Sequence, residues 1–126
     1  MAGLIGFNSI QFLDNREANN LLFKICSKNS SQWGRSLIFI CGDNNNPYGF
    51  FICLTEQHDR QILTGSACGT SIPDMYYDEQ SIYIKLNQYS KISIILFGQA
   101  NIKIEKTDVD IKTLKTLPVS ILKATS

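Results

Sequence analysis

The sequence has no excess of charge of either sign, and this argues against a nucleic-acid partner. Its 126 residues include 12 lysines and arginines against 11 aspartates and glutamates. Neither half of the chain is strongly basic. A protein that binds a phosphate backbone normally carries clustered positive charge. We therefore expect no nucleic-acid partner.

Long apolar runs are also missing. No stretch approaches the roughly 20 residues that a helix needs to cross a bilayer, so we expect no membrane insertion. The opening stretch, MAGLIGFNSIQFLDNREANN, has neither the positive amino-terminal region nor the long apolar segment of a secretory signal. We therefore expect synthesis in the cytoplasm with reduced cysteines.

The sequence lacks the usual marks of a metal centre. His58 is the only histidine, and the four cysteines form no C-x-x-C pair. Each cysteine lies in or near an apolar stretch, which is typical of a buried free thiol that packs as a small apolar side chain. We therefore predict no metal and no cofactor, and we predict buried free thiols at Cys26, Cys41, Cys53 and Cys68.

Catalytic motifs are absent as well. The chain contains no G-x-S-x-G elbow, no P-loop and no H-E-x-x-H motif. One acidic stretch, SIPDMYYDEQS, leaves an alternative open, because paired carboxylates such as Asp74, Asp78 and Glu79 hydrolyse glycosidic bonds when they face a sugar. The pattern favours a short strand, MYY, followed by a turn. We therefore predict that the protein is not an enzyme.

The apolar residues that are present recur with a period of two. In SIYIKLN, Ile82, Ile84 and Leu86 fall on one face of an extended chain, as in a half-buried strand. Turn residues separate such runs at short intervals, which indicates a sandwich or barrel. We predict a single domain over residues 1–126, an all-β antiparallel sandwich of the jelly-roll kind. Its eight or so strands are expected near 21–28, 36–41, 50–56, 61–65, 74–78, 81–87, 91–97 and 101–106.

Three segments allow more than one interpretation. Residues 8–13 are a possible additional strand, and DNREANN could make a helical turn, although it is polar and short. In the tail, residues 107–126, the spacing of Ile111, Leu114 and Leu117 fits a helical turn ending before a proline, or extended chain. The tail docks either on its own sandwich or on a neighbouring subunit.

The stretch GDNNNPYG, between two apolar runs, has the glycines and the proline of a turn. It is longer than a tight hairpin needs, and loops at the end of a sandwich often bind ligands. Aromatic and polar residues in such loops suit sugars or protein surfaces. Trp33 also fits a core position at the start of a strand. The predicted recognition surface consists of Trp33, Arg35, Asn45, Tyr48, His58, Asp59 and Arg60.

The stretch YYDEQSIYIKLNQYSKISIILFG has an acidic turn, a strand, a polar corner and a second strand. It resembles a module found near the ends of bacteriophage tail-fibre and other virion appendage proteins. The upstream SLIFICGDNNNPYGFFICL is similar to the hairpin that often precedes this module. The resemblance covers about residues 21–106. It implies a small β-sandwich knob, usually trimeric, that recognises a glycan or protein on a host surface.

The function we predict is therefore that of a non-enzymatic viral structural protein, a tail-fibre or appendage subunit of the virion. Its expected partners are other virion proteins, further copies of itself with a trimer favoured, and a host-surface glycan or protein. Three alternatives remain open. They are a capsid decoration or connector protein without a host ligand, a cellular carbohydrate-binding module, and a small glycan-degrading enzyme.

Overall fold

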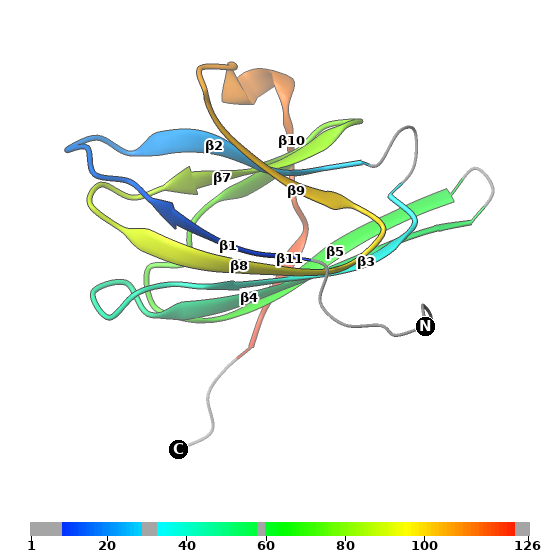
Figure 1. Ribbon diagram of the computed structural model, residues 1–126, viewed down its shortest axis with the longest axis horizontal. Coiled ribbons are helices and arrows are strands. Elements are labelled where there is room, and N and C mark those ends of the chain that lie inside the picture. The colour runs from blue at the N-terminus through cyan, green and yellow to red at the C-terminus, as the bar shows by residue number, and fades with distance from the viewer. Residues whose placement is uncertain (1–8, 29–32, 58–59, 123–126) are drawn as a thin grey trace.

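Two β-sheets pack face to face and enclose one hydrophobic core (Figure 1). The computed structural model describes residues 9–28, 33–57 and 60–122, with the side chains of 9, 56–57 and 60–62 left out of the description. The elements in these ranges are β1 (Ser9–Asp14), β2 (Leu21–Ser27), β3 (Arg35–Cys41), β4 (Tyr48–Gln57), β5 (Arg60–Gly69), β6 (Met75–Tyr77), β7 (Ser81–Leu86), β8 (Lys91–Gly98), β9 (Asn101–Thr107), η1 (Ile111–Thr113), β10 (Lys115–Thr116) and β11 (Val119–Ile121).

The larger sheet, sheet A, has the strand order β1-β8-β3-β4-β5-β11. Strands β3, β4 and β5 follow one another as antiparallel hairpins, whereas β11 runs parallel to β5. Burial alternates along these strands, as the period of two predicts. In β3, for example, Ser36, Ile38 and Ile40 face the core while Leu37 and Phe39 face outward.

The smaller sheet, sheet B, has the order β10-β6-β7-β2-β9, and all its pairs are antiparallel. Strand β7 is buried at every position except Lys85. A β-bulge in β2 shifts the register between Lys24 and Cys26. Because a bulge adds one residue to a strand, Ile25 and Cys26 both turn toward the core.

The two packed, mostly antiparallel sheets confirm the predicted all-β sandwich. Each of the eight predicted strand ranges overlaps an observed strand, and the additional strand near residues 8–13 is β1. The segment between β1 and β2 has bends but no helical turn. The largest fully buried side chains come from both sheets and include Ile38, Ile52, Ile82, Ile84 and Trp33.

The C-terminal segment crosses from one sheet to the other along an open side of the sandwich (Figure 1). It begins with the 3₁₀ turn η1, which the Asp110 side chain caps, and continues as extended chain. Both predicted conformations of the tail therefore occur, one after the other. Strand β10 pairs with β6, β11 pairs with β5, and Leu117 between them is 2% exposed. Up to residue 122 the segment packs on its own sandwich.

The four cysteines are free thiols, but only one of them is fully buried. Cys26 lies in the core, Cys53 is half-buried, and Cys41 and Cys68 are exposed. The prediction of burial is therefore wrong for Cys41 and Cys68. Both occupy outward positions near the ends of strands in sheet A. A continuous apolar run in the sequence does not show which of its side chains point outward.

Candidate ligand-binding hollow

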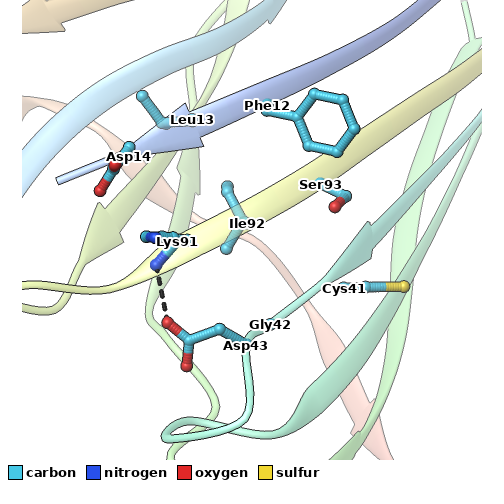
Figure 2. A pocket seen from close by; sticks show the side chains of 9 residues that line it. All are labelled: Phe12, Leu13, Asp14, Cys41, Gly42, Asp43, Lys91, Ile92 and Ser93. Carbon is cyan, nitrogen blue, oxygen red and sulfur yellow. Dashed lines mark hydrogen bonds between the residues drawn. The ribbon is translucent and has the colours of Figure 1, made fainter.

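A hollow of about 310 Å³ opens where strands β1 and β8 meet the loop that follows β3 (Figure 2). We call it the Phe12 hollow. It brings together an aromatic ring, two carboxylates, an amine and a hydroxyl. Its lining residues are Phe12, Leu13, Asp14, Cys41, Gly42, Asp43, Lys91, Ile92 and Ser93.

Phe12 forms the apolar wall of the hollow. Side chains alternate along β1, so Leu13 points into the core while Phe12 points outward. Phe12 is 76% exposed, and its ring stands beside Ser93, its partner in the β1–β8 register (Figure 2). Phenylalanine is normally among the more buried residue types, so an exposed ring beside polar groups is a candidate ligand contact.

Asp43 holds the loop after β3 against the start of β8. Its Oδ1 accepts hydrogen bonds from the N–H groups of Asn45 (2.9 Å) and Asn46 (2.8 Å). Its Oδ2 accepts one from the N–H of Lys91 at 3.0 Å (Figure 2). Desolvation opposes ionisation, but these backbone hydrogen bonds outweigh it and lower the pKa of Asp43. The carboxylate is therefore charged at neutral pH and fixes the shape of the rim.

The other polar groups of the hollow come from facing positions on two strands. Asp14 on β1 pairs in register with Lys91 on β8. The Asp14 carboxylate also accepts a hydrogen bond from Nε of Arg16 at 3.1 Å. Hydrogen-bonding groups beside an exposed ring suit a sugar, because its C–H face packs on the ring while its hydroxyls bond the polar groups.

Tyr48, one of the predicted recognition residues, lies beneath this loop rather than on its surface. The side chain is 8% exposed, and its burial raises its pKa, with a further contribution from Asp43. Gly42 makes room for it, because a Cβ at that position would lie 2.6 Å from a ring carbon of Tyr48. The structure thus corrects the predicted role of Tyr48, which packs in the core. Asn45, at the tip, is exposed as expected.

Trp33 is also a core residue, which was the alternative prediction for it. Its side chain is 0% exposed, and Nζ of Lys28 lies 5.8 Å from the ring centroid. No residue in the described ranges provides a hydrogen-bond partner for its Nε1. A fully buried indole cannot present its face to a host ligand, so Trp33 does not lie on the predicted recognition surface.

The remaining predicted residues do not gather at one end of the sandwich. Arg35 is exposed and begins β3, opposite Thr55, whereas Asn45 follows the far end of the same strand. Seven residues of β3 separate the two ends, a distance of about 20 Å at the usual rise of a strand. Arg60 pairs with Gln57 at the Arg35 end. The predicted single surface is therefore divided between two ends. His58 and Asp59 lie outside the described residues.

The acidic stretch before β7 forms a turn. Oδ1 of Asp78 accepts the N–H groups of Gln80 and Ser81, each at 2.8 Å, and Oδ2 accepts the Tyr83 hydroxyl at 2.7 Å. Partial burial raises the pKa of Asp78, but the Tyr83 hydroxyl and the two N–H groups outweigh it, so the net shift is downward. Asp78 therefore acts as a turn cap. Asp74 and Glu79 are exposed.

Sequence reasoning missed the residues that line the Phe12 hollow. The stretch SIQFLD is apolar on both faces, with Ile10 and Phe12 on one and Leu13 on the other, and this pattern is a signal for an outward aromatic side chain. In GDNNN, an aspartate followed by asparagines is typical of a loop closed by a carboxylate. The pairing of β1 with β8 connects residues far apart in the sequence and left no local signal.

The part of the chain that the structure describes contains no group of three or more histidine, cysteine, aspartate or glutamate side chains that could hold a metal ion. It also contains no helix long and apolar enough to cross a membrane.

Comparisons with known proteins identify a shared fold. No protein-family model matches the sequence, and no curated protein matches it. Among solved structures, the chain is similar to part of Pantoea stewartii WceF, described as "a glycan biofilm modifying enzyme with a bacteriophage tailspike-like parallel beta-helix fold". The match has a TM-score of 0.62 and 14% identity, and it covers 93% of this chain and 23% of that chain. The chain thus spans about a quarter of WceF and shares the fold of that part.

Proposed function

We propose that this chain is a glycan-binding module of a bacteriophage tail fibre or related virion appendage, and that the Phe12 hollow is its binding site. The observation that carries the proposal is the structural match over 93% of the chain to part of a protein described as glycan-modifying and tailspike-like. The tail-fibre resemblance of the sequence points in the same direction. The ligand class is a polysaccharide on the host surface.

The chemistry of the hollow supports a sugar ligand. A pyranose ring would pack its C–H face on Phe12, which is 76% exposed. Its hydroxyls would donate to Asp14 and accept from the ammonium group of Lys91 or the hydroxyl of Ser93. Because Asp43 is already bonded to three N–H groups, it would hold the rim rather than contact the sugar.

A binding role without catalysis fits the properties of two carboxylates, Asp43 and Asp78. A glycosidase needs a general acid whose pKa is raised. The pKa values of Asp43 and Asp78 are lowered, and both carboxylates are bonded to backbone N–H groups. We therefore propose that the chain binds the glycan and that any cleavage belongs to another part of the particle. Its partners would be other virion proteins.

The test is a glycan array of bacterial surface polysaccharides, probed with labelled protein and with two variants of Phe12. Phe12→Ala removes the ring, and we expect at least a tenfold loss of binding, as for one good aromatic contact. Phe12→Tyr keeps the ring and should keep binding. Since the side chain is mostly exposed, both variants should melt within a few degrees of the unaltered protein.

Two results would contradict this proposal. One is a protein that binds no bacterial glycan on the array while its melting transition is intact. The other is binding that Phe12→Ala leaves unchanged, which would exclude this hollow. Release of reducing sugar from a bound glycan would favour the enzyme alternative, and single Asn or Gln substitutions at Asp74, Asp78 and Glu79 would then locate its carboxylates.

A further inference from the structure

A large exposed aromatic side chain stands in the turn between β7 and β8, two residues before Lys91 of the Phe12 hollow. It is Tyr89, which is 61% exposed. We propose that the binding site continues from Phe12 past Lys91 to Tyr89, and that it takes an uncharged oligosaccharide rather than a single sugar. This inference rests on the proposed function, because it extends the same site and names its class of ligand.

The backbone of Tyr89 is strained for a residue of its size. The N–H of Ser90 donates to the carbonyl oxygen of Asn87 at 3.3 Å, so residues 87–90 form a β-turn with Tyr89 at its third position. The φ angle of Tyr89 is 52°, in the left-handed region. Glycine and asparagine adopt this conformation readily, whereas a bulky side chain does so at a cost in free energy. Because strained residues gather at functional sites, an exposed ring at this position indicates a ligand contact.

The loop between β1 and β2 holds the turn in this conformation. The N–H of Tyr89 donates to the carbonyl oxygen of Glu17 at 3.2 Å. The N–H of Gln88 donates to Oδ1 of Asn20 at 3.0 Å. Both bonds come from backbone N–H groups, so neither needs the ring of Tyr89. The turn therefore presents the ring from a fixed backbone, and the ring can be replaced without removing these supports.

The two aromatic rings belong to one end of the sandwich. The β7–β8 turn lies at the same end as the loops that follow β1 and β3 (Figure 1). Phe12 pairs in register with Ser93, which lies four residues after Tyr89. Four residues of chain span at most about 14 Å, and Lys91 lies midway. This span exceeds one pyranose ring and suits a short oligosaccharide with one sugar packed on each aromatic ring.

The charged side chains along this path balance one another. Three are acidic and three are basic, namely Asp14, Glu17 and Asp43 against Arg16, Lys91 and Lys106. Two ion pairs of 3.1 Å each join Asp14 to Arg16 and Glu17 to Lys106. A surface without an excess of either charge does not concentrate a polyanion or a polycation. The ligand that fits this path is therefore an uncharged glycan.

The test uses the polysaccharide that binds best on the glycan array, cut into a graded series from monosaccharide to longer oligosaccharides. Calorimetric titration gives the affinity of each fragment. Tyr89→Asn removes the ring, and we expect at least a tenfold loss of affinity for the longer oligosaccharides. Its affinity for the monosaccharide should not change, because that fragment fills the Phe12 hollow alone. Tyr89→Phe keeps the ring and should keep the affinity.

Thermal unfolding gives a second readout that needs no ligand. The melting temperature of Tyr89→Asn should equal or exceed that of the unaltered protein, because asparagine adopts the left-handed conformation more readily than tyrosine. Gln88→Ala is the matched control. Gln88 is exposed in the same turn, and its variant keeps the backbone N–H that bonds Asn20. This control should leave both the affinity and the melting temperature unchanged.

The outcomes separate this inference from the proposed function. If Phe12→Ala loses binding while Tyr89→Asn binds every fragment as the unaltered protein does, the extension to Tyr89 is wrong and the Phe12 hollow stands. If neither variant loses binding, both proposals fail. A melting temperature of Tyr89→Asn well below that of the unaltered protein would show that the ring supports the fold instead. Affinity that falls steeply with ionic strength would exclude an uncharged ligand.

Discussion

At the scale of single residues, buried polar side chains hold the loops of this sandwich in place. Asn15 is 1% exposed and follows β1. Its amide donates to the carbonyl oxygens of Asn19 (2.9 Å), Leu86 (3.3 Å) and Asn87 (2.9 Å), and its Oδ1 accepts the N–H of Glu17 (3.0 Å). The Asn15 side chain thus satisfies backbone groups both in the loop between β1 and β2 and at the end of β7. An apolar side chain cannot form these hydrogen bonds.

Replacing Asn15 by aspartate should destabilise the fold strongly. Asn15→Asp keeps the shape but turns a charged oxygen toward carbonyl oxygens in a buried site, and we expect a loss of about 3 kcal/mol in the free energy of unfolding. Urea unfolding measures it. Asn44→Asp, at an exposed position of the loop between β3 and β4, is the control and should change stability by less than about 0.5 kcal/mol. Equal effects of the two substitutions would contradict this role for Asn15.

Asp43 should make stability depend on acid pH. Its folded pKa is lowered, so its contribution is complete above the unfolded pKa of about 3.9 and is lost as pH falls through the folded value. In Asp43→Asn the new amide has only one acceptor oxygen, and its NH₂ group faces the N–H of Lys91. We expect the variant to be about 1 kcal/mol less stable near neutral pH.

The loss of the Asp43 contribution at acid pH can be measured by comparing the two proteins over a pH series. Urea unfolding at several pH values should show the difference between Asp43→Asn and the unaltered protein shrinking as pH falls below about 4, because Asp43 becomes protonated as pH passes through its lowered folded pKa. A difference that stays constant down to about pH 2 would mean that the charge of Asp43 contributes nothing.

At the scale of elements, the C-terminal segment closes the sandwich. The N–H of Leu117 donates to Met75 in sheet B at 3.0 Å, and the carbonyl of Pro118 accepts from Gly65 in sheet A at 2.9 Å. Two consecutive residues thus connect the two sheets, and the Leu117 side chain fills the space between them. The apolar spacing of the tail predicted a helical turn or extended chain, and only the partners of Leu117 decided where each occurs.

Leu117→Ala should therefore cost more than its place near the end of the chain suggests. Removing a side chain that is 2% exposed leaves a cavity between the sheets, and we expect a loss of about 2–4 kcal/mol. Ile121→Ala, at a position that is 60% exposed, is the matched control and should cost less than about 1 kcal/mol. Thermal unfolding followed by circular dichroism distinguishes them, and similar melting temperatures would show that the segment does not contribute to the core.

At the scale of the whole molecule, the core thiol reports on the cooperative opening of the sandwich. Cys26 is 0% exposed, and burial raises its pKa to about 12, against a small opposing effect of a backbone hydrogen bond. The thiolate is the reactive form of cysteine. In the folded protein, burial should keep reagents away from Cys26, and the raised pKa should keep its thiol protonated.

We expect iodoacetamide near pH 8 to leave Cys26 unmodified in the native protein and to modify it in urea, in step with global unfolding. Mass spectrometry of peptides measures each cysteine separately, and the exposed Cys41 serves as the internal reference in a dilute sample. Native modification of Cys26 at the rate of Cys41 would contradict the burial of Cys26 in the core between the two sheets.

The sequence by itself determined the class of fold and the approximate position of the strands. Alternation such as that of Ile82, Ile84 and Leu86 is a local property, because side chains on a strand point to opposite faces in turn. Turn residues such as Gly42 and Pro47 are equally local, since they act through their own backbone angles. These two signals suffice to indicate a β-sandwich or barrel.

Only the tertiary structure decided which residues lie together at a surface. Trp33 and Tyr48 stand in polar stretches, but the packing of the two sheets buries both. Phe12, Asp43 and Lys91 meet because β1 and β3 both pair with β8. Such pairings join residues 48 or more apart in sequence, as the bond from Lys91 to Asp43 does. The local propensities of the residues do not predict these contacts, because the contacts depend on which strands become neighbours when the core is buried.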